Sequence, residues 1–206
     1  FIPKLKQHIL FCLTHPDEYI EDKEFEQEQW NKVKIASDHV YVHKSPHVSY
    51  TTYDLRHGED TMNPHTHSDV MVLKCNEADA HPFSYARILG VFHVKVEHED
   101  LLSMPQDIDV LWVCWFQVST KYRSGMKCKW LTRLSFVKGT DAFDFVSPDI
   151  VIHGSQIIPA FVWGPTDTLL GCSVAQQTFH MDILDKNFSW LKEPEMNDYL
   201  YHYVNL

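Results

Sequence analysis

The sequence predicts a mainly β protein, built as a small antiparallel β-barrel with a short N-terminal helical segment and a C-terminal tail packed on it. Turn residues separate runs that are rich in β-branched and aromatic residues, which is the pattern of successive strands. The runs are 69–75, 83–96, 110–118 and 129–137. The chain has 206 residues, 44% of them hydrophobic, so it is long enough for one well-buried core. Strands at such intervals favour a barrel or a sandwich.

The N-terminal segment is expected to form a short helix. Apolar residues recur at spacings of three and four from Ile2 to Leu13, and Pro3 suits the first helical turn. The helix is expected to end near Thr14-His15-Pro16, because the residue before a proline avoids helical angles. An acidic connection follows, with seven carboxylates against one lysine between Asp17 and Glu28.

Two short β-branched runs, Val33–Ile35 and His39–His43, flank Ala36-Ser37-Asp38 and predict a hairpin. Residues 1–45 thus form a first unit, and the barrel is expected to span 46–163. Its closing strand runs from Val151 to Phe161 and is bent at Gly154 and stopped by Pro159.

The C-terminal segment, 164–206, contains aromatic residues that would be unfavourable in water. They are Trp190, Tyr199, Tyr201 and Tyr203. We therefore expect part of this segment to pack on the barrel. Five scattered cysteines without a Cys-x-x-Cys pair favour reduced thiols and an intracellular compartment. No apolar run approaches the length of a membrane helix, so no membrane partner is expected.

The charge distribution bears on nucleic-acid binding in two ways. The net charge of −10 disfavours attraction of phosphates to the whole surface. Residues 121–138, however, contain six basic residues and no acid, interleaved with Tyr122 and Trp130. A basic hairpin of this kind can track a phosphate backbone, which makes nucleic-acid binding the alternative function. Its candidate contacts are Lys121, Arg123, Lys127, Lys129 and Arg133.

His65 and His67 form a His-x-His pair, which on an extended backbone places both imidazoles on one face, as a metal site requires. A cupin-type enzyme also has a glutamate shortly after this pair, but Met71 stands four positions past His67. A cupin-like metalloenzyme is therefore only the third hypothesis. The sequence also lacks a Gly-x-Ser-x-Gly elbow and a glycine-rich phosphate loop. We expect no enzyme, no catalytic residue, no metal and no cofactor.

Trp112 and Trp115 are three positions apart on a predicted strand, so they should lie on opposite faces of it. Both rings cannot enter one core. Either the N- or C-terminal segment covers one of them, or that ring forms an aromatic wall for a peptide or a methylated ammonium group.

Several sequence blocks occur in an order typical of one family. They are Tyr-Thr-Thr-Tyr-Asp at 50–54, Asn-Pro-x-Thr-His-x-Asp-Val-Met-Val-Leu at 63–73, Tyr-Ala-Arg-Ile-Leu-Gly-Val-Phe-His at 85–93, Leu-Trp-Val-x-Trp-Phe at 111–116 and Ile-Ile-Pro-Ala-Phe at 157–161. Together they resemble the C-terminal region of proteins encoded by fungal DNA transposons of the Plavaka type, related to Kyakuja, Dileera and Zisupton elements. His65 stands where that family usually has arginine, so the His-x-His pair is not a family metal motif. The resemblance implies an accessory module, with transposase activity in a separate domain.

A second resemblance concerns the fold of residues 50–161. The Ala-Arg-Ile run at 86–88, Val-x-Trp-Phe at 113–116 and Phe-Asp-Phe-Val-Ser at 143–147 precede a closing strand at 150–158. This order is similar to that of bromo-adjacent homology (BAH) domains.

The BAH resemblance implies a nuclear, non-catalytic module that binds a histone tail or another chromatin protein, and DNA is a further candidate partner through the basic hairpin at 121–138. The peptide contacts that it implies are Phe83, Tyr85, Trp115 and Phe116. Carboxylates would draw a basic tail toward the surface, and candidates are Asp107, Asp109, Asp141 and Asp144.

Overall fold

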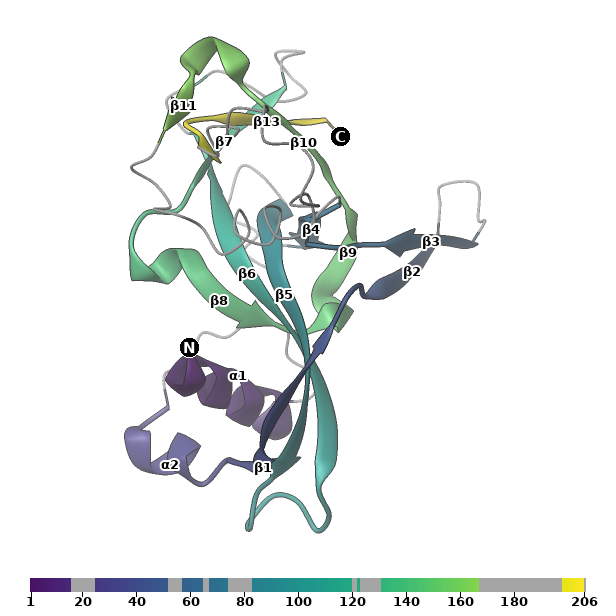
Figure 1. Cartoon of the computed structure of the whole chain (residues 1–206), viewed down its shortest axis with the longest axis vertical. Helices are drawn as coiled ribbons and strands as arrows, with labels where there is room; N and C mark the ends of the chain where they lie inside the picture. Colours follow the sequence, from purple (N-terminus) through teal and green to yellow (C-terminus); the bar gives the residue numbers. More distant parts are fainter. Residues whose placement is uncertain are drawn as a thin grey trace, which may run out of the picture.

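The chain folds into an antiparallel sheet that curls into a nearly closed barrel, with a helix packed at one end (Figure 1). The computed structural model describes residues 1–15, 25–51, 57–64, 67–73, 83–119, 122, 131–166 and 198–205. The helices are α1 (Ile2–Thr14) and α2 (Gln27–Asn31). The first strands are β1 (Lys34–His43), β2 (His47–Thr51), β3 (His57–Thr61), β4 (Asp69–Leu73), β5 (Phe83–Glu97) and β6 (Gln106–Val118).

The later elements complete the barrel. The strands are β7 (Thr132–Phe136), β8 (Phe143–Val146), β9 (Val151–Gly154), β10 (Gln156–Pro159), β11 (Pro165–Thr166), β12 (Asp198–Tyr199) and β13 (His202–Asn205). Short 3₁₀ helices are η2 (Thr140–Ala142), η3 (Pro148–Ile150) and η4 (Phe161–Trp163). The main sheet has the order β10-β13-β7-β6-β5-β4-β9, and β1 and β8 pair with β5 and β6 respectively. β10 and β9 stand at opposite ends of this order but are separated in the chain only by Ser155, so the sheet must curl round on itself.

These elements confirm the prediction of a mainly β, antiparallel barrel. The predicted bend at Gly154 lies between β9 and β10, and the strand stops at Pro159 as expected. The predicted strands at 69–75, 83–96 and 110–118 correspond to β4, β5 and β6. Within the predicted strand 129–137, β7 covers 132–136, and residues 129 and 130 lie outside the described part of the chain.

The N-terminal helix was also predicted correctly, from the first turn with Pro3 to its end at Thr14. Its buried residues Leu5, Ile9 and Leu10 pack with Val94 of β5 and Val110 of β6. Figure 1 shows α1 beside the lower part of these two strands. Burial of this apolar stripe holds the helix in place, since a helix of this length is marginal in isolation. No helix in the described part of the chain is long and apolar enough to cross a membrane.

The predicted hairpin at 33–43 is wrong. Residues 34–43 form one strand, β1, which pairs with β5 on both sides of the presumed turn. Ser37 and Asp38 have φ of 58° and 53°, and the register shifts between Ile35 and Val40. The turn residues therefore form a bulge instead of reversing the chain. Short polar residues such as aspartate tolerate this left-handed conformation better than β-branched ones do.

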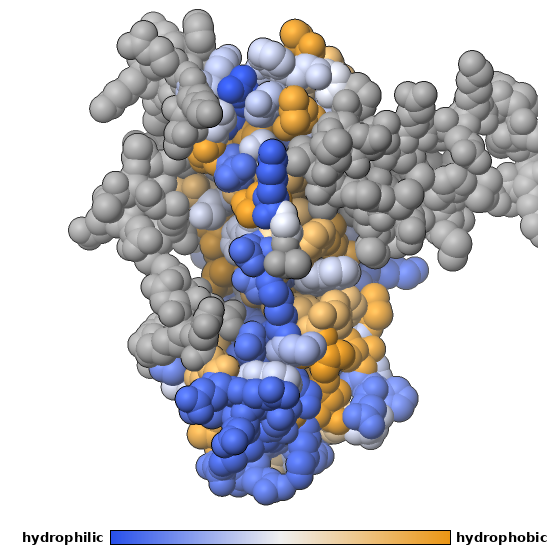
Figure 2. All heavy atoms as spheres, turned by 90° about the vertical axis from the view of Figure 1, so that its left-hand side faces the viewer, coloured by the Kyte–Doolittle hydropathy of each residue, from blue (hydrophilic) through white to orange (hydrophobic). Residues whose placement is uncertain are grey.

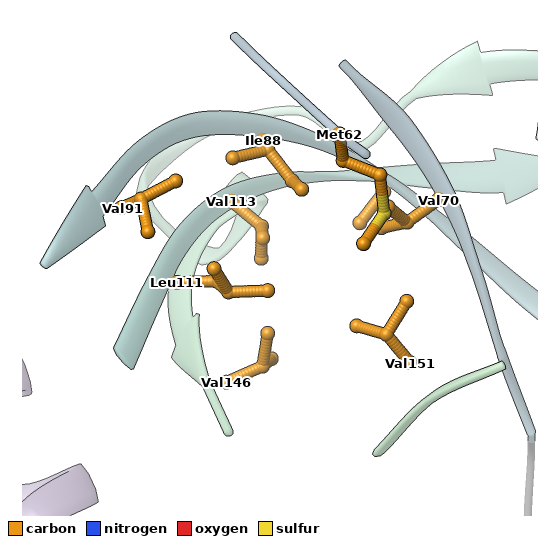
Figure 3. Close-up of a cluster of buried hydrophobic side chains, with 9 residues drawn as sticks. Met62, Val70, Ile88, Val91, Leu111, Val113, Val146 and Val151 are labelled. Carbon is orange, nitrogen blue, oxygen red and sulfur yellow. The ribbon is translucent and has the colours of Figure 1, made fainter. Parts of the chain in front are cut away.

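Both faces of the central strand β6 are buried. Trp115 packs against a cluster that includes Leu111 and Val113, whereas Trp112 packs on the opposite face. Figure 3 shows the first cluster, in which Leu111, Val113 and side chains from neighbouring strands converge. The prediction that the two tryptophans lie on opposite faces is confirmed. The ring of Phe1 lies 5.1 Å from that of Trp112, so the N-terminal segment covers that tryptophan.

The C-terminal strand β13 lies between β10 and β7 and completes the barrel wall. Val204 pairs with Ile157 on one side and with Thr132 on the other. The expectation that part of the tail packs on the barrel is met by the described residues 198–205. Trp190, which the same expectation included, lies outside the described residues.

Candidate functional site

The four predicted peptide contacts do not form one surface. Tyr85 is 1% exposed and Phe116 is 6% exposed, and both belong to a buried cluster with Phe136. Phe83 packs at the edge of the same cluster, whereas Trp115 packs in the cluster on the other face of the sheet. Burial raises the pKa of Tyr85 to about 12, because the phenolate form would lose its hydration. A peptide has no access to Tyr85 or Phe116 in this structure, so these two are core residues.

The predicted nucleic-acid contacts Lys121, Arg123, Lys127 and Lys129 lie outside the described residues. Arg133 is described, and it is 8% exposed. Its guanidinium carbon lies 4.1 Å from the ring centre of Tyr122, 4.2 Å from that of Tyr201 and 5.6 Å from that of Trp163. Its Nη2 donates to Ser119 Oγ at 3.1 Å. This arginine faces aromatic rings and is not presented to a phosphate backbone.

The residues proposed as metal ligands are only partly described. His65 lies outside the described residues, and His67 pairs through its backbone with Asn63. Among the described side chains, no group of three His, Cys, Asp or Glu residues could hold a metal ion. The cupin-like hypothesis stays a prediction that receives no support from the described residues.

The acidic candidates separate into two kinds. The carboxylate of Asp144 accepts a hydrogen bond from the backbone N–H of Phe145 at 2.9 Å, and Asp141 lies on η2. Asp107 and Asp109 lie on β6 and flank His93 of β5. Their carboxylate oxygens are 3.5 Å from His93 Nε2 and 3.1 Å from Nδ1, respectively. His93, which this second pair flanks, lies beside an exposed aromatic ring on its other side.

That ring is Tyr41 on β1, which is 52% exposed. The strand register places Tyr41 opposite His93 and His93 opposite Asp109, so the three side chains form a row across three strands. The rings of Tyr41 and His93 are 5.8 Å apart. His39 and His43 lie two positions either side of Tyr41 and share its face of β1, and the ring of His43 is 5.8 Å from that of His93.

We call this surface the arm face. It consists of His39, Tyr41, His43, His93, Asp107 and Asp109. The opposite face of the same strands bears Val40, Val94 and Ile108, which pack toward α1. Burial of these apolar residues against the helix leaves the polar set on the other side, so the amphipathic pattern of the strands orients the arm face outward. The surface combines an exposed aromatic ring with two carboxylates, and Lys95, the cross-strand partner of Asp107, lies on the same face.

A different polar group lies in the barrel wall. Arg87 Nε and Nη2 donate to the two oxygens of Asp69, at 2.8 and 3.3 Å, and both side chains are largely buried. His202 is 1% exposed, and its ring lies 5.4 Å from those of Phe116 and Phe136. Burial, with a smaller contribution from the charge of Arg87, lowers the pKa of His202 to about 3. The imidazole is therefore neutral at physiological pH, and this group stabilises the wall rather than presenting a reactive surface.

Sequence reasoning missed the arm face because it assigned 33–43 to a hairpin. The signal was present in the alternation His39-x-Tyr41-x-His43, which places these residues on one face of a continuous strand. Asp107 and Asp109 were identified for their charge, but their neighbours could not be known without the strand register. A scan against protein-family models and searches of curated proteins and of solved structures return no match to this chain.

Proposed function

We propose that the chain is a non-catalytic recognition module that binds a basic protein segment, and that a histone tail is the partner class to test first. The observation that supports this proposal best is the arm face, where Tyr41 and Asp109 lie on either side of His93 in a cross-strand row that contains no lysine or arginine. The resemblance to BAH domains and to transposon-encoded proteins supports the same reading. An accessory role in a transposon-derived, nuclear protein belongs to this proposal.

The chemistry of the arm face suits a lysine or arginine side chain. The face of a tyrosine ring attracts a cation, and nearby carboxylates add a direct charge interaction. The side chains of Asp107 and Asp109 are 56% and 70% exposed, so a peptide can reach them without displacing the core. The net charge of −10 would also steer a basic peptide toward the protein.

Titration of the folded protein with histone-tail peptides, unmodified and methylated, tests the proposal. We expect Tyr41→Ala to weaken binding by about tenfold, because a desolvated cation–π contact contributes on that scale. The double variant Asp107→Asn with Asp109→Asn should weaken binding at least as much, and its salt dependence should be shallower. The double variant Glu28→Gln with Glu59→Gln is the matched control, since it removes two exposed carboxylates elsewhere on the surface.

Two outcomes would contradict the proposal. The wild-type protein could fail to bind any of these peptides, or the control double variant could weaken binding as much as the arm-face variant does. Nucleic-acid binding through the basic hairpin at 121–138 is the competing prediction. It predicts that single- or double-stranded DNA binds with steep salt dependence and that Lys127→Glu with Lys129→Glu abolishes this binding.

A further inference from the structure

We infer that Tyr122, Trp163 and Tyr201 form a cation-binding cage for guanidinium groups, which the chain fills with its own Arg133, and that this internal cation fastens the C-terminal strand β13 to the barrel. We call these three rings the aromatic cage. The inference is independent of the arm face and of its peptide.

The first support is the origin of the four residues. Arg133 lies on β7, Trp163 on η4, Tyr201 immediately before β13, and Tyr122 beyond the end of β6. Their positions in the sequence span about 80 residues, yet the three rings all contact one guanidinium group. The rings of Trp163 and Tyr201 also meet at 5.7 Å in an edge-to-face arrangement. One side chain therefore holds together four separate parts of the barrel end.

The second support is the way in which the charge of the Arg133 guanidinium is compensated. It is 8% exposed, and a buried charge is unfavourable unless other groups replace the water that it loses. Within the described residues, no carboxylate forms an ion pair with Arg133, and its buried Nε has no hydrogen-bond partner. The guanidinium group donates a hydrogen bond from Nη2 to Ser119 Oγ, a neutral acceptor. The rings are thus the principal compensation for the charge.

The third support is the position of β13 in the sheet. It is four residues long and forms the seam between β10 and β7. So short a strand exchanges few backbone hydrogen bonds with each neighbour, and its pairing with β7 covers only His202, Tyr203 and Val204. Arg133 is itself the β7 partner of Tyr203, and its guanidinium stacks on the ring of Tyr201 two positions earlier. Loss of the caged cation is therefore expected to loosen this seam first.

Hydrogen exchange of the β13 amides in the full chain tests the inference. In Arg133→Ala we expect these amides to exchange at least about tenfold faster than in wild type, whereas the amide of Val113 in β6 is unchanged. Millimolar methylguanidinium chloride should reverse the effect in a saturable way, because the emptied cage can bind a free guanidinium. The same salt should not change the wild-type protein, whose cage is full, and sodium chloride at equal ionic strength should not rescue the variant.

The inference would be overturned if methylguanidinium did not slow β13 exchange in Arg133→Ala. It would also be overturned if the salt slowed β13 exchange in wild type as much, or if sodium chloride slowed it as much in the variant. If Arg133→Ala does not fold, Tyr122→Leu tests the same point, because it removes the ring nearest to the guanidinium. Its control is Phe161→Leu, which lies on the same 3₁₀ helix as Trp163 and contacts Tyr199 but is not part of the cage. We expect faster β13 exchange in Tyr122→Leu only. Equal exchange in the two variants would also overturn the inference.

Discussion

Arg87 and Arg133 lie on strands of the same sheet and both stack on aromatic rings, but their charges are compensated differently. Arg87 lies over Phe116 and Phe136, at 5.5 and 5.1 Å, and its guanidinium is held by the carboxylate of Asp69. Arg133 lies closer to two of its three rings than Arg87 does to either of its own, and no described carboxylate pairs with Arg133. The first is an ion pair with aromatic support, and the second is a cation supported by rings.

From this difference we expect that an apolar side chain can replace Arg133 at little cost in stability but cannot replace Arg87. Removing one partner of a buried ion pair leaves the other charge without compensation, which is strongly destabilising. Removing a cation from an aromatic cage leaves a space lined by ring faces and hydroxyl groups. An apolar side chain can fill that space. The same chemical change should therefore destabilise the region of Arg87 much more than the region of Arg133.

The largest expected effect is that of Arg87→Met compared with Arg133→Met. We expect Arg87→Met to lower the free energy of unfolding by about 3–5 kcal/mol, because the carboxylate of Asp69 is left largely buried and unpaired. Arg133→Met should lower it by only about 1 kcal/mol, through loss of the cation–π contacts. Urea denaturation at neutral pH measures both values.

A double variant tests whether the unpaired carboxylate of Asp69 causes the loss of stability in Arg87→Met. Asp69→Asn with Arg87→Met removes both charges, and its stability should recover most of the loss caused by Arg87→Met alone. Equal losses for Arg87→Met and Arg133→Met would show that the carboxylate is not what distinguishes the two sites.

The next expected effect is a dependence of the unfolding free energy on pH, which arises from His202 near Arg87. The unfolded chain protonates His202 near pH 6.5, whereas burial holds the folded pKa at about 3. Between these values the unfolded state binds more protons, so stability falls as the pH falls, by about 1.4 kcal/mol per pH unit. At pH 5 this contribution is about 2 kcal/mol.

The matched variant is His202→Leu, which keeps an apolar group against the rings of Phe116 and Phe136 and cannot take up a proton. Its unfolding free energy should become less dependent on pH than that of wild type between pH 6.5 and pH 3. Denaturation curves at several pH values give the difference directly. If the two pH profiles run parallel, the buried imidazole is not the source of the acid sensitivity.

The barrel could be predicted from the sequence because its strands are marked by local patterns, such as the β-branched and aromatic runs of β5 and β6 and the bend at Gly154. The arm face and the aromatic cage could not be predicted from the sequence, because each depends on the pairing register between strands that are distant in the chain. Tyr41, His93 and Asp109 are far apart in the chain, and only the pairing register brings them into one row. In β5 and β6, alternate residues face the core, and the register decides which set does so. Tyr85 and Phe116 are aromatic in the same way as Tyr41, so composition alone does not distinguish an inward ring from an outward one. The bulge at Ser37 and Asp38 was mistaken for a turn because both use the same residue types.

The smallest expected effect concerns an exposed ion pair, which is the reference for the two buried arginines. The ammonium of Lys34 bonds the carboxylate of Glu99, which raises the pKa of Lys34 and lowers that of Glu99. Their side chains are 58% and 77% exposed, and hydrophilic residues gather at this lower end of the molecule, where the turn between β5 and β6 lies (Figure 2). Water and salt screen such a pair, and ordering two long side chains offsets much of the attraction. Lys34→Met should therefore leave the urea midpoint of unfolding unchanged within error, and so should Glu99→Gln. A fall in the midpoint as large as that of Arg133→Met would show that exposed and caged cations contribute equally, and that burial is not what gives Arg133 its effect.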